Sequence, residues 1–407
     1  MANPAPRPRL AIVSPFIDKR HGTERRVAEC ISHLSSDFEI HIYSQRVEDI
    51  PLEQVIWHRI PAVPGPHVLG YLWWFAANHL WRWRDESIRG LHFDVVYSPG
   101  INCLNADAVT VHVVFAEMRR RLRDELRLAN NPLVSWPRVV HRRLYYRLIE
   151  SLERRIYPRA NLAIGVVSDQ VSGELVRHFN RTENVEVIYH GVDTDVFSPE
   201  MRHYRRADAR KQFGLLEDEI ILLLIGNGWR NKGLPCLLEA LSQLGDLPVR
   251  LLVVGQDDRA PFDEMAARFN IAARVTFLPP SPDVAQFYAA CDIYTGPSLH
   301  DSFAMPPAEA MACGLPVVTS RNNGGSGIIA HGENGLILED AHDFMALGKL
   351  IRSLCESCEL RDRLGRNAAC AASQFTWKNN AQRMRELFTR AILVRKQQDA
   401  GTTSVAS

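Results

Sequence analysis

Hydrophobic residues follow two alternating patterns along this chain. Short apolar runs are separated by longer segments in which apolar residues recur every three or four positions, so the runs predict buried strands and the longer segments predict amphipathic helices. Strands are expected at 10–16, 38–44, 94–100, 108–114, 162–168 and 185–191 in the first half, and at 220–226, 249–255, 274–278, 292–298 and 315–320 in the second. This alternation is typical of βαβ units and parallel sheets.

The apolar runs fall into two sets, with a polar stretch near residues 198–206 between them. We therefore expect an α/β protein with two Rossmann-like lobes, one over residues 1–197 and one over residues 198–380. Residues 381–407 are expected to form a last helix and a polar tail. Ligands of such sheets bind beyond the carboxyl ends of the strands, and two facing lobes would enclose a cleft.

The composition argues against several classes of protein. The sequence has 48 basic and 47 acidic residues and a net charge of +1, whereas a general nucleic-acid binder carries a clear basic excess. No apolar segment approaches the roughly 20 residues of a membrane-spanning helix, and the start of the chain lacks the apolar core of a signal peptide. We expect a cytoplasmic protein without a nucleic-acid partner; the patterns specify no oligomeric state.

One segment departs from the average composition. Residues 119–159 contain twelve arginines, four acidic residues and no lysine. A predicted helix in this segment places most arginines opposite an apolar face formed by Leu144, Tyr145, Leu148, Ile149, Leu152 and Ile156. Just upstream come four tryptophans, Trp73, Trp74, Trp81 and Trp83. Aromatic and basic residues together suit an anionic membrane surface, and a core-packed helix with a solvated charged face is an equally good interpretation.

The most specific stretch is 300–320, which follows a predicted strand. The proline pair at 306–307 is expected to start a short helix, and Gly314 to end it in a left-handed conformation. Such a helix N-terminus stabilises an anion such as phosphate. We expect Glu309 in the first turn, where its carboxylate suits the two hydroxyls of a ribose, and Asp301 in the loop, facing a sugar. Taken alone, the two acids fit a helix cap and a solvated side chain equally well.

The residues D-S-F-A-M-P-P-A-E-A-M-A-C-G-L-P-V-V at 301–318 resemble the E-x7-E region of retaining glycosyltransferases with the GT-B fold, in particular glycosyltransferase family 4. The chain keeps the second acid, the helix and the following strand. It departs from the pattern at Asp301, where the family has glutamate, and at Ala304, where the family has glycine. The resemblance implies that Asp301 acts on the sugar and that the donor is bound by Phe303, Ala304, Met305 and Glu309.

The resemblance extends over most of the chain. The stretch LLLIGNGWRNKGLPCLLEAL at 222–241 looks like the family's strand, glycine turn and KG element, which implies that Lys232 contacts the donor's phosphates. Many members carry an arginine where this chain has Asn227, and Arg230 is the candidate substitute. Residues 14–34 look like the family's first strand, glycine loop and helix, in which Gly22 would let the backbone approach the donor. The last helix of this fold crosses back onto the first lobe.

His112 lies on the strand predicted at 108–114, on the face opposite Val109 and Val111. From the pattern alone, it fits a satisfied interior histidine. Family members carry a histidine in the corresponding region, where it lines the sugar and acceptor site. The resemblance therefore implies a catalytic role for His112.

The chemistry implied by the resemblance is transfer of a sugar from a nucleoside-diphosphate sugar to a saccharide or lipid-linked acceptor, with retention of the anomeric configuration. Fixed positive groups must stabilise the charge that builds up on the diphosphate. Lys232, Arg230 and the helix N-terminus would supply them, and no D-x-D pair stands in a metal-holding context, so neither metal nor cofactor is expected. The tryptophan and arginine segments make a lipid-linked or lipopolysaccharide-core acceptor at the inner membrane face a candidate.

Other functions remain compatible with the sequence. A related fold serves sugar-nucleotide epimerases and phosphorylases, although no lysine stands in a convincing setting for the pyridoxal cofactor of a phosphorylase. A non-catalytic sugar-nucleotide-binding scaffold fits the altered first acid and glycine. A glycosidase using Asp301 and Glu309 would need both carboxyl groups to flank one sugar. A dinucleotide-dependent oxidoreductase is disfavoured, because no G-x-G-x-x-G follows a predicted strand.

Overall fold

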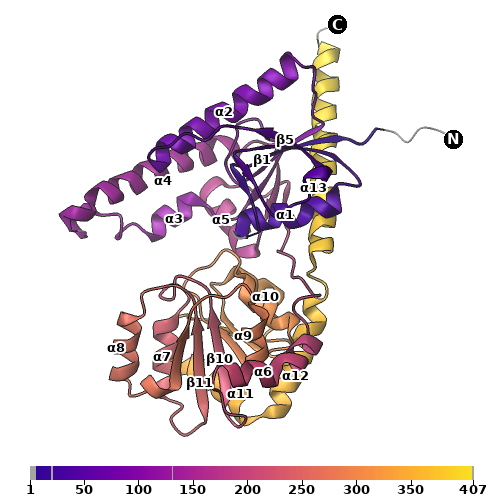
Figure 1. Cartoon of the computed structure of the whole chain (residues 1–407). Coiled ribbons are helices and arrows are strands. Elements are labelled where there is room, and N and C mark those ends of the chain that lie inside the picture. The colour runs from indigo at the N-terminus through magenta and orange to yellow at the C-terminus, as the bar shows by residue number, and fades with distance from the viewer. Residues whose placement is uncertain (1–5, 20–21, 131, 406–407) are drawn as a thin grey trace, which may run out of the picture. The chain divides into compact units, whose positions relative to one another are not determined.

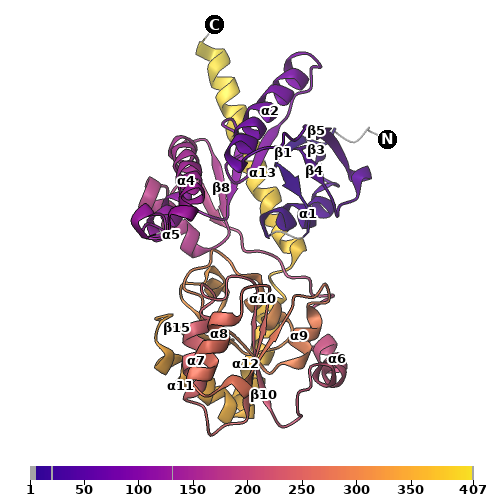
Figure 2. The ribbon, with the colours of Figure 1, turned by 60° about the vertical axis from the view of Figure 1, so that its left-hand side comes forward.

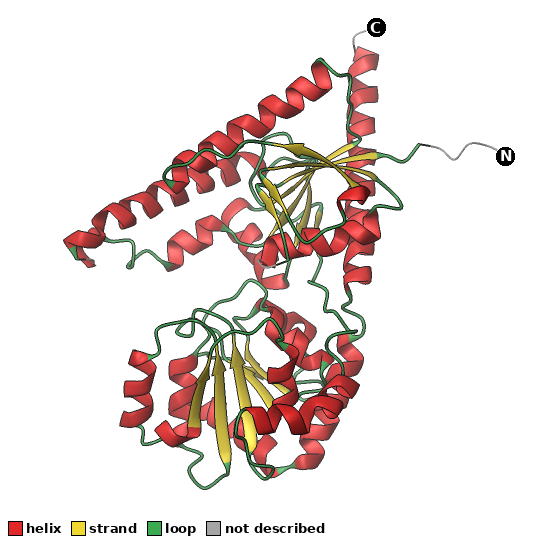
Figure 3. Ribbon diagram, viewed as in Figure 1, coloured by secondary structure: helices red, strands yellow, loops and turns green. Residues whose placement is uncertain are grey.

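The structure is a computed structural model that describes residues 6–19, 22–130 and 132–405. The chain divides into two compact units (Figure 1, Figure 2). The first unit comprises Met1–Ile188 together with Trp377–Ser407, and the second comprises Tyr189–Thr376. Each unit has its own parallel sheet flanked by helices (Figure 3). The predicted fold class, α/β with two Rossmann-like parallel-sheet units, is confirmed.

The first unit contains a seven-stranded sheet with the order β5-β3-β1-β6-β7-β8-β9, in which every pair is parallel. Its strands are β1 (Arg9–Val13), β3 (Glu39–Ser44), β5 (Val55–Arg59), β6 (Val95–Pro99), β7 (Ala108–Val111), β8 (Ala163–Val166) and β9 (Val185–Val187). β2 (Phe16–Ile17) pairs with β4 (Arg46–Val47) in a separate small sheet. β5 was not predicted, because this edge strand is only partly buried and lacks a continuous apolar run.

The core of the first unit lies where the sheet meets α1 (Gly22–Leu34) and α13 (Trp377–Val405). Met384, Leu387 and Phe388 of α13 are almost fully buried in it. The last helix therefore belongs to the first unit, as the fold class predicts. It continues to Val405, so the stretch expected as a tail is largely helical. The other helices of the unit are α2 (His67–Ser87), α3 (Phe115–Arg121), α4 (Trp136–Ile156) and α5 (Asp169–Phe179).

The arginine-rich segment forms α3, α4 and the connection between them. The apolar face predicted for α4 is only partly buried, since Leu144 is 55% exposed. The buried positions of α4 include two acids, Glu150 and Glu153. Glu153 accepts hydrogen bonds from the backbone N–H groups of Phe115 and Ala116, at 2.7 and 3.0 Å, and so caps the start of α3. Burying this carboxyl raises the pKa of Glu153 to about 8, against the effect of those two hydrogen bonds.

The second unit contains a six-stranded parallel sheet with the order β12-β11-β10-β13-β14-β15. Its strands are β10 (Ile220–Ile225), β11 (Val249–Val254), β12 (Val275–Leu278), β13 (Ile293–Gly296), β14 (Val317–Ser320) and β15 (Leu336–Leu338). All but β15 were predicted. β15 has three residues and follows a glycine-rich stretch, so its apolar run is too short to be recognised.

Seven helices accompany this sheet in the described part of the chain: α6 (Pro199–Gln212), α7 (Leu234–Ser242), α8 (Ala260–Arg268), α9 (Ala285–Ala290), α10 (Met305–Ala312), α11 (Phe344–Glu356) and α12 (Cys358–Ala372). Short 3₁₀ segments occur in the two units at Leu52–Gln54, Leu128–Asn130, Leu133–Ser135, Ala272–Arg274 and Gly324–Ile328. One large core joins α7, α8 and α11 to the sheet, with Leu237, Leu241 and Leu347 fully buried.

The change from the first unit to the second falls after Ile188, upstream of the division expected at residues 197 and 198. Ile188 packs into the core of the first unit. The next residue, Tyr189, contacts the rings of Phe303 and Phe375 in the second unit, at centroid distances of 6.0 and 5.7 Å. Aromatic packing therefore assigns the segment before α6 to the second unit. The return to the first unit occurs at Trp377, close to the expected residue 381.

Candidate functional site

In the second unit, the candidate site begins with the loop between β10 and α7, which carries Arg230 and Lys232. Gly233 starts α7 with a φ of +82°, a conformation that favours glycine. A Cβ atom at Gly233 would lie 2.0 Å from the carbonyl oxygen of Pro297, so only glycine fits here. The close approach brings the residue after Lys232 against the end of β13.

A second loop, from β13 to α10, meets the first. The backbone N–H of Leu299 donates to the carbonyl oxygen of Asn231 at 2.7 Å, and the Asn231 side chain donates to the carbonyl oxygen of His300 at 2.7 Å. Asp301 follows directly, with its own backbone bonded to Asn322 and Gly324. These bonds fix the two loops together at the carboxyl ends of β10 and β13, where Figure 3 shows the arrowheads of the sheet.

The paired loops bring together two of the predicted site residues. Lys232 Nζ lies 2.6 Å from Asp301 Oδ2, and the two side chains remain 13% and 21% exposed. The ammonium and the carboxylate are thus neutralised by each other yet reachable from solvent. Arg230, predicted beside them, has an exposed side chain that makes no hydrogen bond or ion pair with any described residue.

The helix α10 begins at Met305, one residue before the proline pair. Both prolines lack an N–H, so the first turn has fewer backbone donors for an anion than an ordinary helix start. Glu309 is the fifth residue of α10 and lies in its second turn, not in the first as predicted. Gly314 ends the helix with a φ of +71°, which confirms the prediction for this residue.

Glu309 is buried, with 6% of its surface exposed. Its Oε2 accepts a hydrogen bond of 2.7 Å from the hydroxyl of Tyr288 in α9, which is itself fully buried. Tyr294 of β13 has a raised pKa because it is buried and because the charges of Asp301 and Glu309 lie near it. The two acids therefore lie around one strand end, and one oxygen of Glu309 is already engaged by a tyrosine.

The other residues predicted to bind the sugar donor lie between Asp301 and Glu309 in the sequence. Phe303 and Ala304 are 9% and 3% exposed, so their side chains belong to the core. The Phe303 ring lies 5.1 Å from that of His190, and the Ala304 N–H donates to Asn323 Oδ1 over 3.4 Å. Met305 is half-buried at the helix start. Any contact of Phe303 or Ala304 with a ligand would therefore pass mainly through the backbone.

His112 and Gly22 lie in the first unit. His112 follows β7 and lines a cavity of about 280 Å³ together with Asn102, Tyr71 and Tyr145. Thr110 Oγ1 lies 3.4 Å from its Nε2. Burial, together with the positive charge of Arg26, holds the pKa of His112 well below its usual range, so the imidazole is neutral near pH 7.

Gly22 is the first residue of α1, and the next two residues of that helix, Thr23 and Glu24, line the His112 cavity. A Cβ at Gly22 would have no atom within 4 Å. The protein's own packing therefore does not require glycine there. Gly22 therefore lies next in sequence to residues that line the His112 cavity.

Some residues of these sites were not found from the sequence. Tyr288, Asn231 and Asn323 act through contacts with other segments of the chain, and no local pattern marks them. Among the described residues there is no group of three or more His, Cys, Asp or Glu side chains arranged to hold a metal ion.

Two family profiles match the chain. Residues 20–196 match the family described as Glycosyltransferase Family 4, and residues 205–370 match the family described as Glycosyl transferases group 1. Together they account for nearly all of the first unit before α13 and most of the second.

Curated relatives match a smaller part of the chain. D-inositol 3-phosphate glycosyltransferase of Corynebacterium kroppenstedtii is 30% identical over 253 residues, which are 59% of this chain and 55% of the relative. The enzyme of that name from Mycobacteroides abscessus is 31% identical over 255 residues, 59% of this chain and 54% of the relative. The chain thus spans about half the length of the curated relatives it matches.

Solved structures match over nearly the whole chain. WaaG, a glycosyltransferase involved in lipopolysaccharide biosynthesis, superposes with a TM-score of 0.73 at 19% identity, over 93% of this chain and 99% of that one. Sucrose-phosphate synthase from Thermosynechococcus elongatus gives 0.72 at 20% identity, over 94% and 99%. HepE from Anabaena, solved with UDP-glucose, gives 0.66 at 20% identity, over 93% and 99%. At these identities the likeness concerns the fold, and it confirms the predicted GT-B class.

Proposed function

We propose that this chain, which belongs to the group 1 glycosyl transferases, moves a sugar from a nucleoside-diphosphate sugar to a saccharide or lipid-linked acceptor. The curated relatives carry the name glycosyltransferase, and the structural neighbour HepE was solved with UDP-glucose. The observation that carries the proposal is the Lys232–Asp301 pair, which two loops hold at the carboxyl ends of β10 and β13.

The pair suits a reaction that places negative charge on a leaving diphosphate. A phosphate near Lys232 competes with Asp301 for the ammonium, and the ammonium then stabilises the charge that develops as the sugar–phosphate bond breaks. The same exchange releases the Asp301 carboxylate to accept hydrogen bonds from hydroxyls of the sugar. Arg230, exposed in the same loop and without a partner among the described residues, supplies a second mobile cation.

Glu309 and Tyr288 suit the nucleoside end of the donor. One carboxylate oxygen of Glu309 is held by the tyrosine hydroxyl, which fixes the orientation of the group. A carboxylate oriented in this way can accept a ribose hydroxyl without first reorganising. The interaction is common to all ribonucleoside diphosphates, so the proposal extends to uridine, guanosine and adenosine donors alike.

In the first unit, the cavity around His112 has the size and polarity for a hydroxyl-bearing ligand. Because the pKa of His112 is lowered, the neutral ring accepts or donates a hydrogen bond near pH 7 without bringing a charge. We assign the sugar and acceptor hydroxyls to this region. The transfer is proposed to retain the anomeric configuration and to need no metal, since Lys232 and Arg230 supply the positive charge.

The decisive experiment incubates the purified chain with UDP-, GDP- and ADP-sugars and a panel of saccharide and lipid-linked acceptors. We expect a glycoside product whose anomeric configuration, measured by NMR, matches that of the donor, and a rate that EDTA leaves unchanged. Conversion of the sugar nucleotide without an acceptor would identify an epimerase. Binding of the nucleotide, seen as a thermal shift, without any transfer would identify a non-catalytic scaffold.

We also propose that the protein is cytoplasmic and binds the inner face of an anionic membrane, where lipid-linked or lipopolysaccharide-core acceptors reside. In the described residues no helix combines the length and the apolar character needed to cross a bilayer. The outer surface of α2 carries an exposed apolar stripe at helical spacing, formed by Leu69, Leu72, Trp73, Leu80 and Trp83. Trp74, by contrast, is buried and donates to Asn102, so the tryptophans divide between core and surface.

Vesicle co-sedimentation tests the membrane proposal. At low salt, where electrostatic attraction is least screened, the chain should sediment with anionic vesicles and not with neutral ones. Replacing both Leu80 and Trp83 by Ala should weaken this binding without unfolding the chain, because both side chains are more than half exposed. A chain that stays in solution with anionic vesicles contradicts the proposal.

A further inference from the structure

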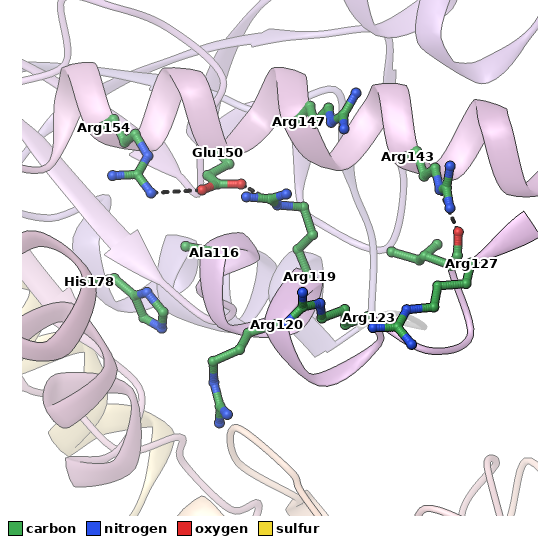
Figure 4. A pocket seen from close by; sticks show the side chains of 11 residues that line it. Ala116, Arg119, Arg120, Arg123, Arg127, Arg143, Arg147, Glu150, Arg154 and His178 are labelled. Carbon is green, nitrogen blue, oxygen red and sulfur yellow. Dashed lines mark hydrogen bonds and ion pairs between the residues drawn. The ribbon is translucent and has the colours of Figure 1, made fainter.

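A groove of about 580 Å³ in the first unit is lined by seven arginines and a single carboxylate, Glu150. It lies where α3 and the turn after it face α4 (Figure 4). α3 and the turn contribute Arg119, Arg123 and Arg127, which are spaced four residues apart. One face of α4 contributes Arg143, Arg147 and Arg154 at helical spacing. The catalytic proposal uses none of these residues.

Several of these guanidinium groups are held in place by the protein. Glu150 is buried and pairs with Arg119 and, at 2.8 Å, with Arg154, so it joins the two sides of the groove. Arg143 donates to the backbone carbonyl of Leu126. Each guanidinium carries five N–H donors and uses only some of them in these bonds, so it keeps others for a ligand.

Next to the groove, Glu117 is completely buried and forms ion pairs with Arg120 at 2.7 Å and Arg121 at 2.8 Å, and its carboxylate lies 2.8 Å from His178 Nε2. The pair with Glu117 therefore fixes the guanidinium group of Arg120 in the wall of the groove. Anchored donors bind an ion with less loss of side-chain entropy than free ones.

Two arginines are not neutralised. The side chains of Arg123 and Arg147 make no hydrogen bond or ion pair with any residue that the structure describes. They come from opposite sides of the groove. Seven arginines and one carboxylate line the groove, and Glu117 and Asp124 pair with Arg120 and Arg127 next to it, so the groove keeps a net positive charge that an anionic ligand would relieve.

The groove is separate from the cavity around His112. α3 and α4 direct Phe115, Met118, Tyr145 and Ile149 toward that cavity. The arginines that the two helices direct toward the groove are Arg119, Arg120, Arg143, Arg147 and Arg154. The same two helices thus present an aromatic and apolar side to one site and a basic side to the other.

We infer that this groove is a second anion site, which binds a ligand carrying two or more phosphate groups. Arginine, used here without any lysine among the lining residues, has a planar guanidinium group whose paired N–H donors bind two oxygens of one phosphate. A single phosphate ion would fill only a small part of the groove and meet only a few of its arginines. A ligand with several phosphates spans the distance from the α3 side to the α4 side.

The test is a calorimetric titration of the full chain with tripolyphosphate, carried out in a Lys232→Ala background so that the donor site does not contribute. We expect saturable binding that weakens as salt is raised, and much weaker binding of inorganic phosphate. The double variant Arg123→Gln/Arg147→Gln should bind tripolyphosphate at least roughly tenfold more weakly, since each lost charged hydrogen bond amounts to a factor of ten or more.

The matched control is Arg138→Gln/Arg155→Gln, which removes the same charge from two exposed α4 arginines outside the groove. It should bind tripolyphosphate as the parent does, and both double variants should melt at the parent's temperature. Equal weakening of tripolyphosphate binding in both double variants would show that net charge alone causes the effect, and it would overturn the inference. So would binding of phosphatidic acid vesicles without binding of tripolyphosphate, because the arginines would then recognise a lipid surface.

The inference stands apart from the proposed transferase activity. UDP-glucose affinity, measured in the chain with Lys232 intact, should be unchanged in the groove variant. Loss of tripolyphosphate binding with unchanged UDP-glucose affinity supports a separate site, whereas parallel loss of both would overturn the separation.

Discussion

At the scale of single residues, the candidate site depends on charges that lie far apart in the sequence. Lys232 and Asp301 are 69 positions apart and meet at 2.6 Å, since two loop backbones are bonded to each other beside them. Tyr288 and Glu309 form a second such contact at 2.7 Å. Both Lys232 and Asp301 were recognised from motifs, whereas in the second pair only Glu309 was, and the structure adds its partner Tyr288.

Replacing Lys232 by Ala should lower kcat/KM for sugar transfer by about ten- to a hundredfold, because the ammonium stabilises the leaving diphosphate only as its charge develops. Steady-state kinetics of the purified variant measure this effect. The fold should be unchanged, since Asp301 is partly exposed and can be solvated. Lys349→Ala, an exposed position on α11, is the matched control and should keep the parental rate. Near-normal turnover of Lys232→Ala would contradict the phosphate role.

Glu117 illustrates how a buried charge affects stability. The hydrogen bond from Arg120, together with those from His178 and Arg121, holds the pKa of Glu117 well below its usual range. The folded-state pKa is therefore lower than the unfolded value of about 4.3. The resulting stabilisation is fully present above that value and is lost as the pH falls through the folded-state pKa.

We expect Glu117→Gln to lower the free energy of unfolding near pH 7 by about 3–5 kcal/mol, because several cations lose their buried partner. Urea unfolding measured from pH 7 down to pH 3 should show the difference from the parent shrinking below about pH 4. Glu53→Gln, which changes an exposed acid of the same unit, should have little effect at any pH. A difference independent of pH would show that the carboxylate charge is not the cause.

At the scale of elements, loops at strand ends position the functional groups. The turn that starts α7 places Lys232, and it does so by packing Gly233 against the carbonyl of Pro297 at the end of β13. α10 contributes a buried acid in its second turn, and its proline pair limits the backbone donors at its start. The cationic side chains of the β10–α7 loop therefore matter more for an anion than the helix start alone.

Gly233→Ala should damage both stability and activity. The left-handed backbone alone costs about 1–2 kcal/mol for alanine, and the clash with Pro297 adds to this and displaces Lys232. Gly228→Ala is the matched control, since Gly228 has a φ of +76° but its Cβ would meet only the Asn231 Cβ at 4.0 Å. Urea unfolding and kcat/KM should both show a larger loss for Gly233→Ala. Equal losses would mean that the close approach to β13 is unimportant.

At the scale of the whole molecule, the chain forms two units with separate cores, and the last helix returns to the first of them. Phe388 of α13 is fully buried among residues of that core, with its ring 5.9 Å from Phe38 and 5.0 Å from Tyr97. The core of the first unit is therefore incomplete without α13, and the stability of the unit depends on the contacts that α13 makes.

Phe388→Ala should destabilise the first unit by about 3–5 kcal/mol through loss of buried contacts and the cavity left behind. Because the second unit has its own core, its unfolding transition should stay near the parental midpoint, so the variant should unfold in two separated steps. Scanning calorimetry and tryptophan fluorescence measure both transitions. Leu393→Ala, 56% exposed on the same helix, should behave as the parent. A single transition shifted as a whole would mean that the two units unfold together.

The sequence by itself determined the α/β class, most strands of both sheets and the end of α10 at Gly314. These features depend on local periodicity and on the backbone freedom of single glycines, both of which are set by neighbouring residues. The roles expected of Lys232 and Asp301 came from the resemblance to the family. β5 and β15 were not predicted from the sequence, because β5 is partly exposed and β15 is very short.

Only the tertiary structure decided which of these residues act together. The Lys232–Asp301 pair, the tyrosine on Glu309 and the arginine groove between α3 and α4 each depend on which loops and helix faces meet. The buried glutamates of α4 show the reason, because the pattern of apolar residues does not mark them, whereas in the structure Glu150 binds arginines and Glu153 caps α3. Contacts of this kind are set by long-range packing, which no local pattern of residues encodes.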